Sequence, residues 1–417
     1  MANSFLTTDL AAKELAFEYK NEIRFARSLS MQYSDLFANA SSDAGKIGST
    51  VRVRKPVRWQ ATEGQAFQEQ AINEPYVVVP LDKQYNIGMG WSTAEQTTDI
   101  SDVMARYIKT AAQELANRVD NYAFEATYLD VWNAVGTPGT VPSALLTYLQ
   151  ADTQIFNQSV NESVDRMAIL SGISMATIAN ANSTLFNPVG DVSKAYKTGY
   201  QQSDTAGIAK WFKSQNVQPY TTGGWASGTS TPLINGASQT GASLITDGWS
   251  SGAVTLQKGD TFTIANVFTV TPVGHTNTGQ LQSFVVTSAI SDTTGDMTIP
   301  IAPSIITSGP LQTVSASPAD GAAITVRGAS GTTTATMTAT SSVQNLLYVK
   351  DFATLVHVDL AMPNGGADGS RFSHPDWGIS LRLVKQYNIL TDQNPCRIDV
   401  LVGAKTIDGG RAARIYS

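Results

Sequence analysis

The segment from Ile47 to Val135 constrains the fold most, because a long β-ribbon runs directly into one long helical pattern. The outgoing strand, Ser49–Trp59, alternates apolar residues with arginines, which is typical of a half-buried strand. The return strand, Tyr76–Met89, repeats this alternation. An extended strand of about eleven residues reaches roughly 35 Å. The sequence therefore predicts an arm that extends beyond its own domain.

One long helix is expected after the ribbon. Asp99 is the expected N-cap, and apolar residues then recur at three- and four-residue spacing until Gly136 and Pro138 end the pattern. About 35 residues at ~1.5 Å each make a helix of roughly 54 Å. Charged residues within the pattern exclude a regular coiled coil and a membrane span. We expect a single helix that runs the width of a domain.

Composition changes abruptly near residue 221. Only seven charged side chains occur among the 125 residues from Thr221 to Asn345, whereas Ser, Thr and Gly together number 57. Short β-branched runs alternate with turns such as Lys258-Gly259-Asp260. The pattern predicts a small all-β domain, a barrel or a sandwich, inserted into a mixed chain. A disordered Ser/Thr linker is the alternative, and the apolar alternation argues against it for most of the segment.

The flanking segments have a mixed α and β pattern. An N-terminal helix is capped by Thr7 or Thr8 and has one apolar stripe and one strongly charged face. Arg166–Ser171 is a candidate buried strand, and Arg397–Val402 is expected to be the last strand. The expected organisation is an arm (1–46), the β-ribbon (47–92), the long helix (93–136), a first α/β part (137–221), the inserted β-domain (222–344) and a second α/β part with closing strands (345–417).

The sequence contains little that suggests chemistry. Its three histidines are widely separated, and its one cysteine, Cys396, precludes an intrachain disulfide. We expect no catalytic residues, no metal and no cofactor. The net charge of −6 disfavours nucleic acid as the main partner. The N-terminus lacks the basic and apolar regions of a secretion signal, and no apolar run is long enough to span a membrane.

Three local sequences resemble one family of viral coat proteins. They are Val57–Gly64 in the ribbon, Ile108–Val119 in the long helix, and Leu256–Ile264 with its Lys-Gly-Asp turn. Together with the order of the elements, they resemble the major capsid proteins of tailed phages, which have the Hong Kong 97-type fold. The closer resemblance is to the P-twenty-two-type branch, whose members carry an inserted β-barrel. The C-terminal segment Lys405–Arg414 departs from the Arg-Pro-Glu-Ala-like tail of many members.

The resemblance implies an α+β fold with an N-terminal arm, an extended β-loop, a spine helix, peripheral and axial domains, and the inserted barrel. It implies a major capsid protein that assembles with itself into hexamers and pentamers of an icosahedral shell. A scaffolding protein, a portal protein and packaged DNA, touched weakly and non-specifically, are the implied partners. The protein would assemble in the host cytoplasm and reside in the virion capsid. The alternatives are another β-rich virion or surface component (a tail, decoration or adhesin-like binding protein) and, less favoured, an enzyme.

Charged residues of the ribbon and arm are the candidate contact residues. The ribbon's basic residues could pair with opposite charges on a neighbouring subunit, or they could be a solvated face that deters aggregation. In the inserted domain, Asp247 and apolar packing through Trp249 are the candidate contacts. The arm's glutamates could recruit scaffold, or they could be a solvated helix face. The ribbon candidates are Arg52, Arg54, Lys55, Arg58, Glu63, Glu69 and Glu74, and the arm candidates are Glu14, Glu18 and Glu22.

Overall fold

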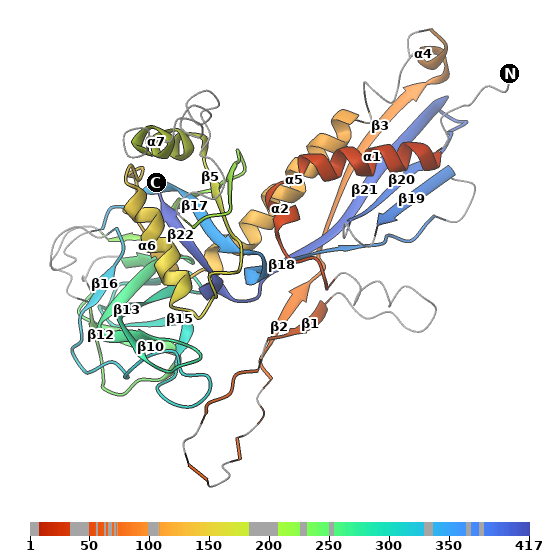
Figure 1. The fold of residues 1–417 in the computed structure, drawn as a ribbon. Coiled ribbons are helices and arrows are strands. Elements are labelled where there is room, and N and C mark those ends of the chain that lie inside the picture. Colours follow the sequence, from red (N-terminus) through yellow and green to blue (C-terminus); the bar gives the residue numbers. More distant parts are fainter. Residues whose placement is uncertain are drawn as a thin grey trace. The chain divides into compact units, whose positions relative to one another are not determined.

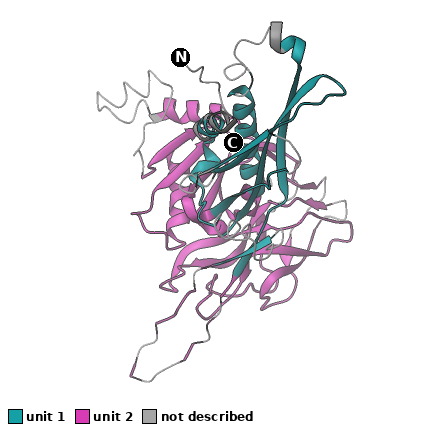
Figure 2. Cartoon of the chain, turned by 90° about the vertical axis from the view of Figure 1, so that its right-hand side faces the viewer, with its two compact units in different colours: residues 1–54, 76–126, 353–407 teal, residues 55–75, 127–352, 408–417 magenta. Residues whose placement is uncertain are grey.

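The computed structural model describes residues 8–33, 50–55, 57–61, 64–65, 69–70, 72, 74–98, 107, 109–182, 207–225, 232–249, 254–328, 337–363, 368–374 and 379–417. The chain forms two compact units, each assembled from separate stretches of sequence (Figure 2). Unit 1 comprises Met1–Arg54, Tyr76–Ala126 and Ala353–Ile407. Unit 2 comprises Lys55–Pro75, Thr127–Phe352 and Asp408–Ser417.

Unit 1 is built on a five-stranded antiparallel sheet around one long strand, β21 (Gln393–Thr406). Alternate residues of β21 from Cys396 to Ala404 are buried, and Asp399 and Gly403 between them are buried as well. One edge of β21 pairs with β3, and the other pairs with β20 and then β18. The remaining strands are β3 (Lys83–Ser92), β18 (Ala353–Val358), β19 (Asp368–His374) and β20 (Ile379–Lys385).

Two helices cover this sheet (Figure 1). The arm helix α1 (Thr8–Glu22) packs on β19 and β20, and a short helix, α2 (Phe25–Ser28), follows it. The longer helix α5 (Lys109–Thr127) meets the arm where the backbone N–H of Ala26 donates to Asp120 at 2.7 Å. A further helix, α4 (Thr93–Thr98), follows β3. The predicted apolar stripe of the arm is confirmed, since these residues are all buried: Ala12, Leu15, Ala16, Tyr19, Ile23 and Ala26.

The long helix ends earlier than the sequence predicts. Its expected start at Asp99 lies outside the described residues, and α5 ends at Thr127 instead of running to Val135. A 3-10 turn (Tyr128–Asp130) and a strand, β4 (Asn133–Val135), follow it. The prediction was wrong because the apolar residues of this short stretch fit either period, whereas all three β4 residues are buried in a sheet.

Unit 2 contains a six-stranded mixed sheet in the order β4-β22-β17-β5-β6, with β7 also paired to β17. Its second strand, β22 (Ala412–Tyr416), runs parallel to β4 and antiparallel to β17 (Ser341–Val349). The expected last strand, at 397–402, is therefore not the last. The other elements are β5 (Arg166–Leu170), β6 (Lys210–Lys213), β7 (Pro219–Thr221), α6 (Leu145–Phe156) and α7 (Gly172–Asn182).

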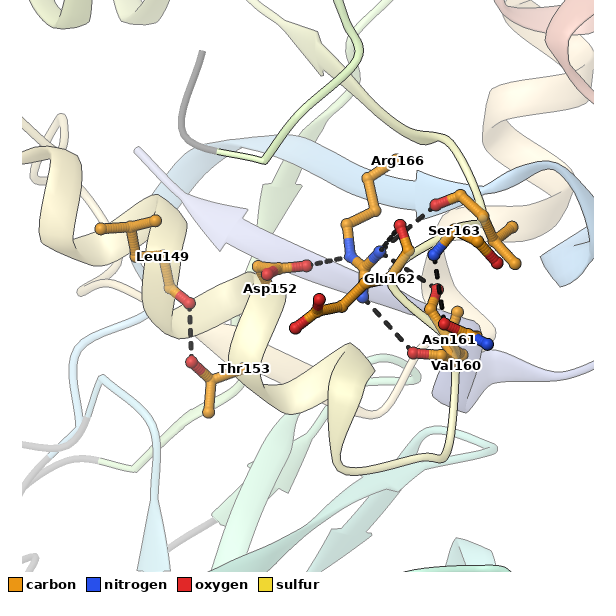
Figure 3. A network of polar contacts seen from close by, with 9 residues as sticks. Leu149, Asp152, Thr153, Val160, Asn161, Glu162, Ser163 and Arg166 are labelled. Atoms are coloured by element: carbon orange, nitrogen blue, oxygen red, sulfur yellow. Dashed lines mark hydrogen bonds and ion pairs between the residues drawn. The ribbon is translucent and has the colours of Figure 1, made fainter. Parts of the chain in front are cut away.

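A buried arginine fixes the loop between α6 and β5 (Figure 3). The Arg166 guanidinium forms an ion pair with Asp152 of α6. It also donates to four carbonyl oxygens of the loop, at 3.2 to 3.5 Å, and only 3% of the residue is exposed. One side chain thus holds the loop that leads into β5. The four carbonyls belong to Val160, Asn161, Glu162 and Val164.

The Ser/Thr-rich segment of unit 2 is largely β-structure around its own core. Its main sheet has six strands in the order β16-β12-β13-β15-β10-β9, and a three-stranded sheet has the order β14-β11-β8. The Trp225 and Trp249 rings meet edge to face in the core, with centroids 5.5 Å apart. The strands are β8 (Gly224–Trp225), β9 (Leu233–Ile234), β10 (Gly241–Asp247), β11 (Val254–Leu256), β12 (Thr261–Val270), β13 (Asn277–Val286), β14 (Ile290–Asp292), β15 (Met297–Ile305) and β16 (Ile324–Val326).

Candidate assembly surfaces

The base of the ribbon is a two-stranded antiparallel pair, β1 (Thr50–Arg54) with β2 (Tyr76–Pro80). Val53 and Val79 point to one face, where they are buried against Val356 of β18 and Ile407. Arg52, Arg54, Tyr76 and Val78 are exposed. The alternation read from the sequence therefore places the apolar side against unit 1 and the arginine side outward.

The paired part of the ribbon is shorter than predicted. β1 ends at Arg54 instead of Trp59, and the expected return strand is divided, since Lys83–Ser92 pairs with β21 instead of with β1. Proline has no backbone N–H to extend a ladder, and the sequence places one at position 80, where β2 ends. A Cβ at Gly403 of β21 would lie 2.1 Å from the Pro80 carbonyl oxygen, so only glycine allows this close approach.

The charged ribbon residues occupy different environments. The Arg52 guanidinium lies 4.8 Å from the centre of the Tyr76 ring, which is a cation–π contact on the exposed face. Lys55 is half-buried, and its N–H donates to the Pro75 carbonyl at 2.8 Å. Arg58 lies 3.8 Å from Asp408. Of the three glutamates, Glu69 and Glu74 are exposed, and Glu63 lies outside the described residues.

Beyond the base of the ribbon, the Gln70 side chain holds the two sides together by hydrogen bonds to the Gln60 backbone. The Gln60 N–H donates to the Gln70 side-chain oxygen at 3.1 Å, and the Gln70 amide donates back to the Gln60 carbonyl. One glutamine thus replaces a rung of the ladder where strand pairing has ended.

Two of the arm glutamates already have partners on α5. Glu18 forms an ion pair with Lys109 at 3.1 Å, and Glu22 accepts a hydrogen bond from the Gln113 amide at 3.1 Å. The side chain of Glu14 lies outside the described part of the structure. These contacts place part of the arm's charged face against the long helix, so this face is not wholly available to another protein.

In the Ser/Thr-rich segment, Asp247 and Trp249 have different positions. Asp247 is partly exposed at the end of β10. Trp249 is only 5% exposed, and its indole N–H donates to the Thr246 hydroxyl at 2.8 Å. The expectation that this ring packs against a neighbouring subunit is wrong, because Trp249 fills the segment's own core against Trp225. Its long-range partner could not be identified from local sequence.

The side chains that could take part in catalysis or metal binding lie far apart in the structure. His357 is buried beside the Tyr19 hydroxyl at 3.1 Å, and burial lowers its pKa from 6.5 to about 4. Burial raises the pKa of the Cys396 thiol, which disfavours the reactive thiolate. Among the described residues, no three His, Cys, Asp or Glu side chains gather as a metal site. No helix in the described part is long and apolar enough to cross a membrane.

Sequence reasoning missed a buried polar cluster around the Lys258-Gly259-Asp260 turn. Asp260 is 1% exposed and accepts hydrogen bonds from the Tyr220 hydroxyl at 2.9 Å and from two backbone N–H groups. The fully buried Arg414 of β22 donates to the Gly259 carbonyl. Gly259 has a φ of +102°, and a Cβ there would lie 2.6 Å from Leu129. The turn was visible in the sequence, but its distant partner on β22 was not.

The chain is similar to solved structures of the Mycobacterium phage Che8 (9% identity, 94% of this chain, 90% of the other, TM-score 0.49) and of the cyanophage P-SCSP1u capsid (12%, 88%, 83%, 0.45). It is also similar to the CUS-3 coat protein I-domain (28% identity, 24% of this chain, 97% of the other, TM-score 0.19). A search of curated proteins finds no match.

The family comparison is decisive because it spans most of the sequence. The family model described as P22 coat protein, gene protein 5, matches residues 40–409. This range includes the ribbon, α5, the Ser/Thr-rich segment and β21. The family match thereby confirms the resemblance and the Hong Kong 97-type fold predicted from the sequence, and the helices and strands confirm the mixed α+β class. The chain belongs to the P22 coat protein family and is a major capsid protein of a tailed phage.

Proposed function

We propose that the protein builds the icosahedral shell as hexamers and pentamers, in which the ribbon of each subunit grips its neighbour. The observation that carries this proposal is the two-sided ribbon base. Val53 and Val79 anchor one face to unit 1, while Arg52 and Arg54 are exposed on the other. A ribbon held in this way presents its charges to a second protein without losing its own attachment.

Weak individual contacts suit this task. An exposed ion pair contributes about 0–1 kcal/mol. In a closed shell each subunit makes many such contacts at once, so their combined effect is large. Weak single contacts also let a misplaced subunit dissociate before the shell closes. The basic residues Arg52, Arg54, Lys55 and Arg58 are therefore proposed contact residues, with Glu69, Glu74 and Glu63 as further charges of the ribbon.

Shortening the ribbon tests the gripping role. Deletion of residues 60–73 leaves β1, β2 and their buried valines in place. We expect a folded monomer with unchanged circular dichroism that forms no closed shells in electron micrographs. As a matched charge test, the double variant R52E/R54E should reduce shell yield, and K210E, on edge strand β6, should not. Normal shells from the deletion variant would exclude the gripping role.

We propose that the arm helix contributes to recruitment of a scaffolding protein through Glu14, Glu18 and Glu22. Because Glu18 and Glu22 contact α5, replacing either would also disturb the arm itself, so the single test is made at Glu14. E14A should lower scaffold-dependent shell yield, while K109Q, which breaks the Glu18 pair and retains all three glutamates, should not. Equal yields from E14A, from the triple alanine variant and from wild type would argue against this role.

We propose a portal protein and packaged DNA as the remaining partners. The net charge of −6 supports only weak, non-specific contact with DNA. Such contact would be electrostatic and would weaken as the salt concentration rises. A filter-binding titration of assembled empty shells against fragmented DNA, read at two salt concentrations, would test this expectation.

A further inference from the structure

A cavity of about 450 Å³ lies in unit 2, on the face of the main β-sheet that points away from the tryptophan core. Its floor comes from β12, β13 and β16, and one wall comes from Gly136 and Thr137, directly after β4. The described residues that line it include an arginine and several hydroxyl groups but no carboxylate.

The strand register assembles the hydroxyl groups. Thr263 of β12 lies opposite Ser283 of β13 on one side and opposite Thr325 of β16 on the other. Residues directly opposite in neighbouring strands project to the same face, so three hydroxyls form a row across three strands. The next residues along β12, Phe262 and Ile264, belong to the core on the other face. This polar row is therefore a consequence of the same alternation that builds the core.

Arg327 continues this face beyond Thr325. Its backbone N–H donates to the Thr261 carbonyl at 2.9 Å, and its guanidinium donates to the Gly136 carbonyl at 3.0 Å through Nη1. Its Nε is buried and has no hydrogen-bond partner in the described structure. A buried donor without a partner costs about 1–3 kcal/mol, and a ligand accepts from this Nε once the Arg327 side chain turns to bring it to the cavity surface.

A second guanidinium increases the positive charge. Arg414 is fully buried, and its Nε and Nη1 also have no hydrogen-bond partner among the described residues. Asp260, the carboxylate nearby, already accepts from Tyr220, Gly223 and Gln257. Burial lowers the pKa of Arg327, and the proximity of Arg414 lowers it further. The region thus contains two guanidinium groups and one carboxylate, so its positive charge is not fully balanced.

We propose that this cavity binds one small oxyanion, held by Arg327 and by the hydroxyls of Thr263, Ser283 and Thr325. A guanidinium matches two oxygens of a phosphate or carboxylate group at once, and hydroxyls donate to the others. The oxyanion is either free inorganic phosphate or the carboxylate of an acidic side chain on another copy of this chain. Both present the same oxygen chemistry to the site.

Binding of inorganic phosphate to the full-length monomer is the first test. Calorimetric titration with sodium phosphate, against sodium chloride of equal ionic strength, should give saturable binding of one phosphate. R327Q should weaken this binding by about tenfold or more, which is the effect of losing one charge-assisted bond. K210Q is the matched control, since β6 and β4 are opposite edges of their sheet, and its binding should equal that of wild type.

A second variant keeps the test decisive if R327Q fails to fold. T263V preserves the shape and β-branching of the side chain and removes the central hydroxyl of the row. It should weaken phosphate binding several-fold with an unchanged melting temperature in chloride. Unchanged phosphate affinity in every folded pocket variant, or equal responses to phosphate and chloride, would overturn the proposal.

Assembly in phosphate-free buffer distinguishes the two sources of the oxyanion. If free phosphate is the occupant, T263V and wild type should form shells equally well, and added phosphate should protect wild type more than T263V against thermal unfolding. If a carboxylate of another copy is the occupant, phosphate should compete with assembly of wild type, and T263V should assemble less. No binding to the monomer together with no effect of phosphate or of T263V on assembly would overturn the site.

Discussion

Two buried arginines of unit 2 occupy opposite kinds of environment. Arg166 is 3% exposed and combines an ion pair with Asp152 and hydrogen bonds to four loop carbonyls. Arg414 is fully buried, yet its guanidinium donates to one carbonyl, that of Gly259, and otherwise lies near the Tyr220 and Tyr416 rings. The Arg166 guanidinium therefore has protein partners for its donors, whereas the Arg414 guanidinium has donors without a hydrogen-bond partner among the described residues.

This difference teaches how to separate structure from function in a protein without catalytic chemistry. A buried charge with all its partners in the chain has a sufficient structural explanation. A buried charge with unpartnered donors carries a desolvation cost that its own fold does not offset. The second kind marks a place where another molecule can contribute, and here Arg327, which Arg414 influences electrostatically, lines the hydroxyl-rich cavity.

The largest effect is expected from Arg166→Met. The variant leaves Asp152 and four carbonyls without their partner, so we expect a loss of about 3 kcal/mol in the free energy of unfolding. Urea unfolding of the monomer measures it. Arg411→Met is the matched control, because its pair with Asp351 is 3.7 Å long and a third or more of each side chain is exposed, and it should cost less than about 1 kcal/mol. Equal losses of unfolding free energy in the two variants would show that the buried network of Arg166 stabilises the fold no more than the pair of Arg411 does.

A decrease in pH should lower the free energy of unfolding by a comparable amount, through the buried imidazole of His357. The folded-state pKa of His357, about 4, is below its ordinary 6.5, so between these values the unfolded chain binds the extra proton. The free energy of unfolding should fall by about 3 kcal/mol as pH decreases from 6.5 to 4. H357Q should lack this component. Parallel pH profiles for the variant and wild type would show that the histidine is not responsible.

Arg414→Met should have a smaller effect than Arg166→Met. Removal of a buried and poorly partnered charge relieves its desolvation cost, so the stability should stay within about 1 kcal/mol of wild type in phosphate-free buffer. Thermal and urea unfolding of both variants side by side would measure the difference. A loss as large as that of Arg166→Met would break the comparison and make Arg414 a structural residue.

The smallest effect on stability is expected at the ribbon. Arg52 is exposed and contacts the Tyr76 ring, so Arg52→Gln should change the free energy of unfolding by less than about 1 kcal/mol. Its effect belongs to assembly, where shell yield should fall while monomer stability does not. A variant that loses stability and yield in parallel would show that the arginine acts within its own subunit.

Periodicity predicted the elements whose buried side is set locally. The stripe through Leu15 and Tyr19 and the alternation around Val53 follow from spacing alone, and the structure buries each of these residues. Spacing failed at Val131–Val135, where a short apolar run fits a helix as well as a strand and the parallel partner β22 decides. Whether this stretch is helix or strand therefore depends on residues 280 positions away, since Asn133 pairs with Ala413.

The candidate surfaces were only partly predictable for the same reason. The ribbon's arginine face could be read from the sequence because alternate residues of a strand project to opposite sides. Trp249 was placed on the surface because its core partner, Trp225, is not adjacent in sequence. The hydroxyl row and Arg327 depend on the register of three strands, which a single sequence does not specify.

The position of β22 has a consequence for synthesis of the protein. This strand lies between β4 and β17, so the sheet of unit 2 lacks an inner strand until residues 412–416 leave the ribosome. Until then, the edges of β4 and β17 that it joins have unpaired backbone groups, which favour association with other chains. A stalled or truncated polypeptide cannot complete the sheet. The sheet of unit 2 therefore depends on residues 412–416, and a chain that stops before them cannot enter a particle with this unit intact.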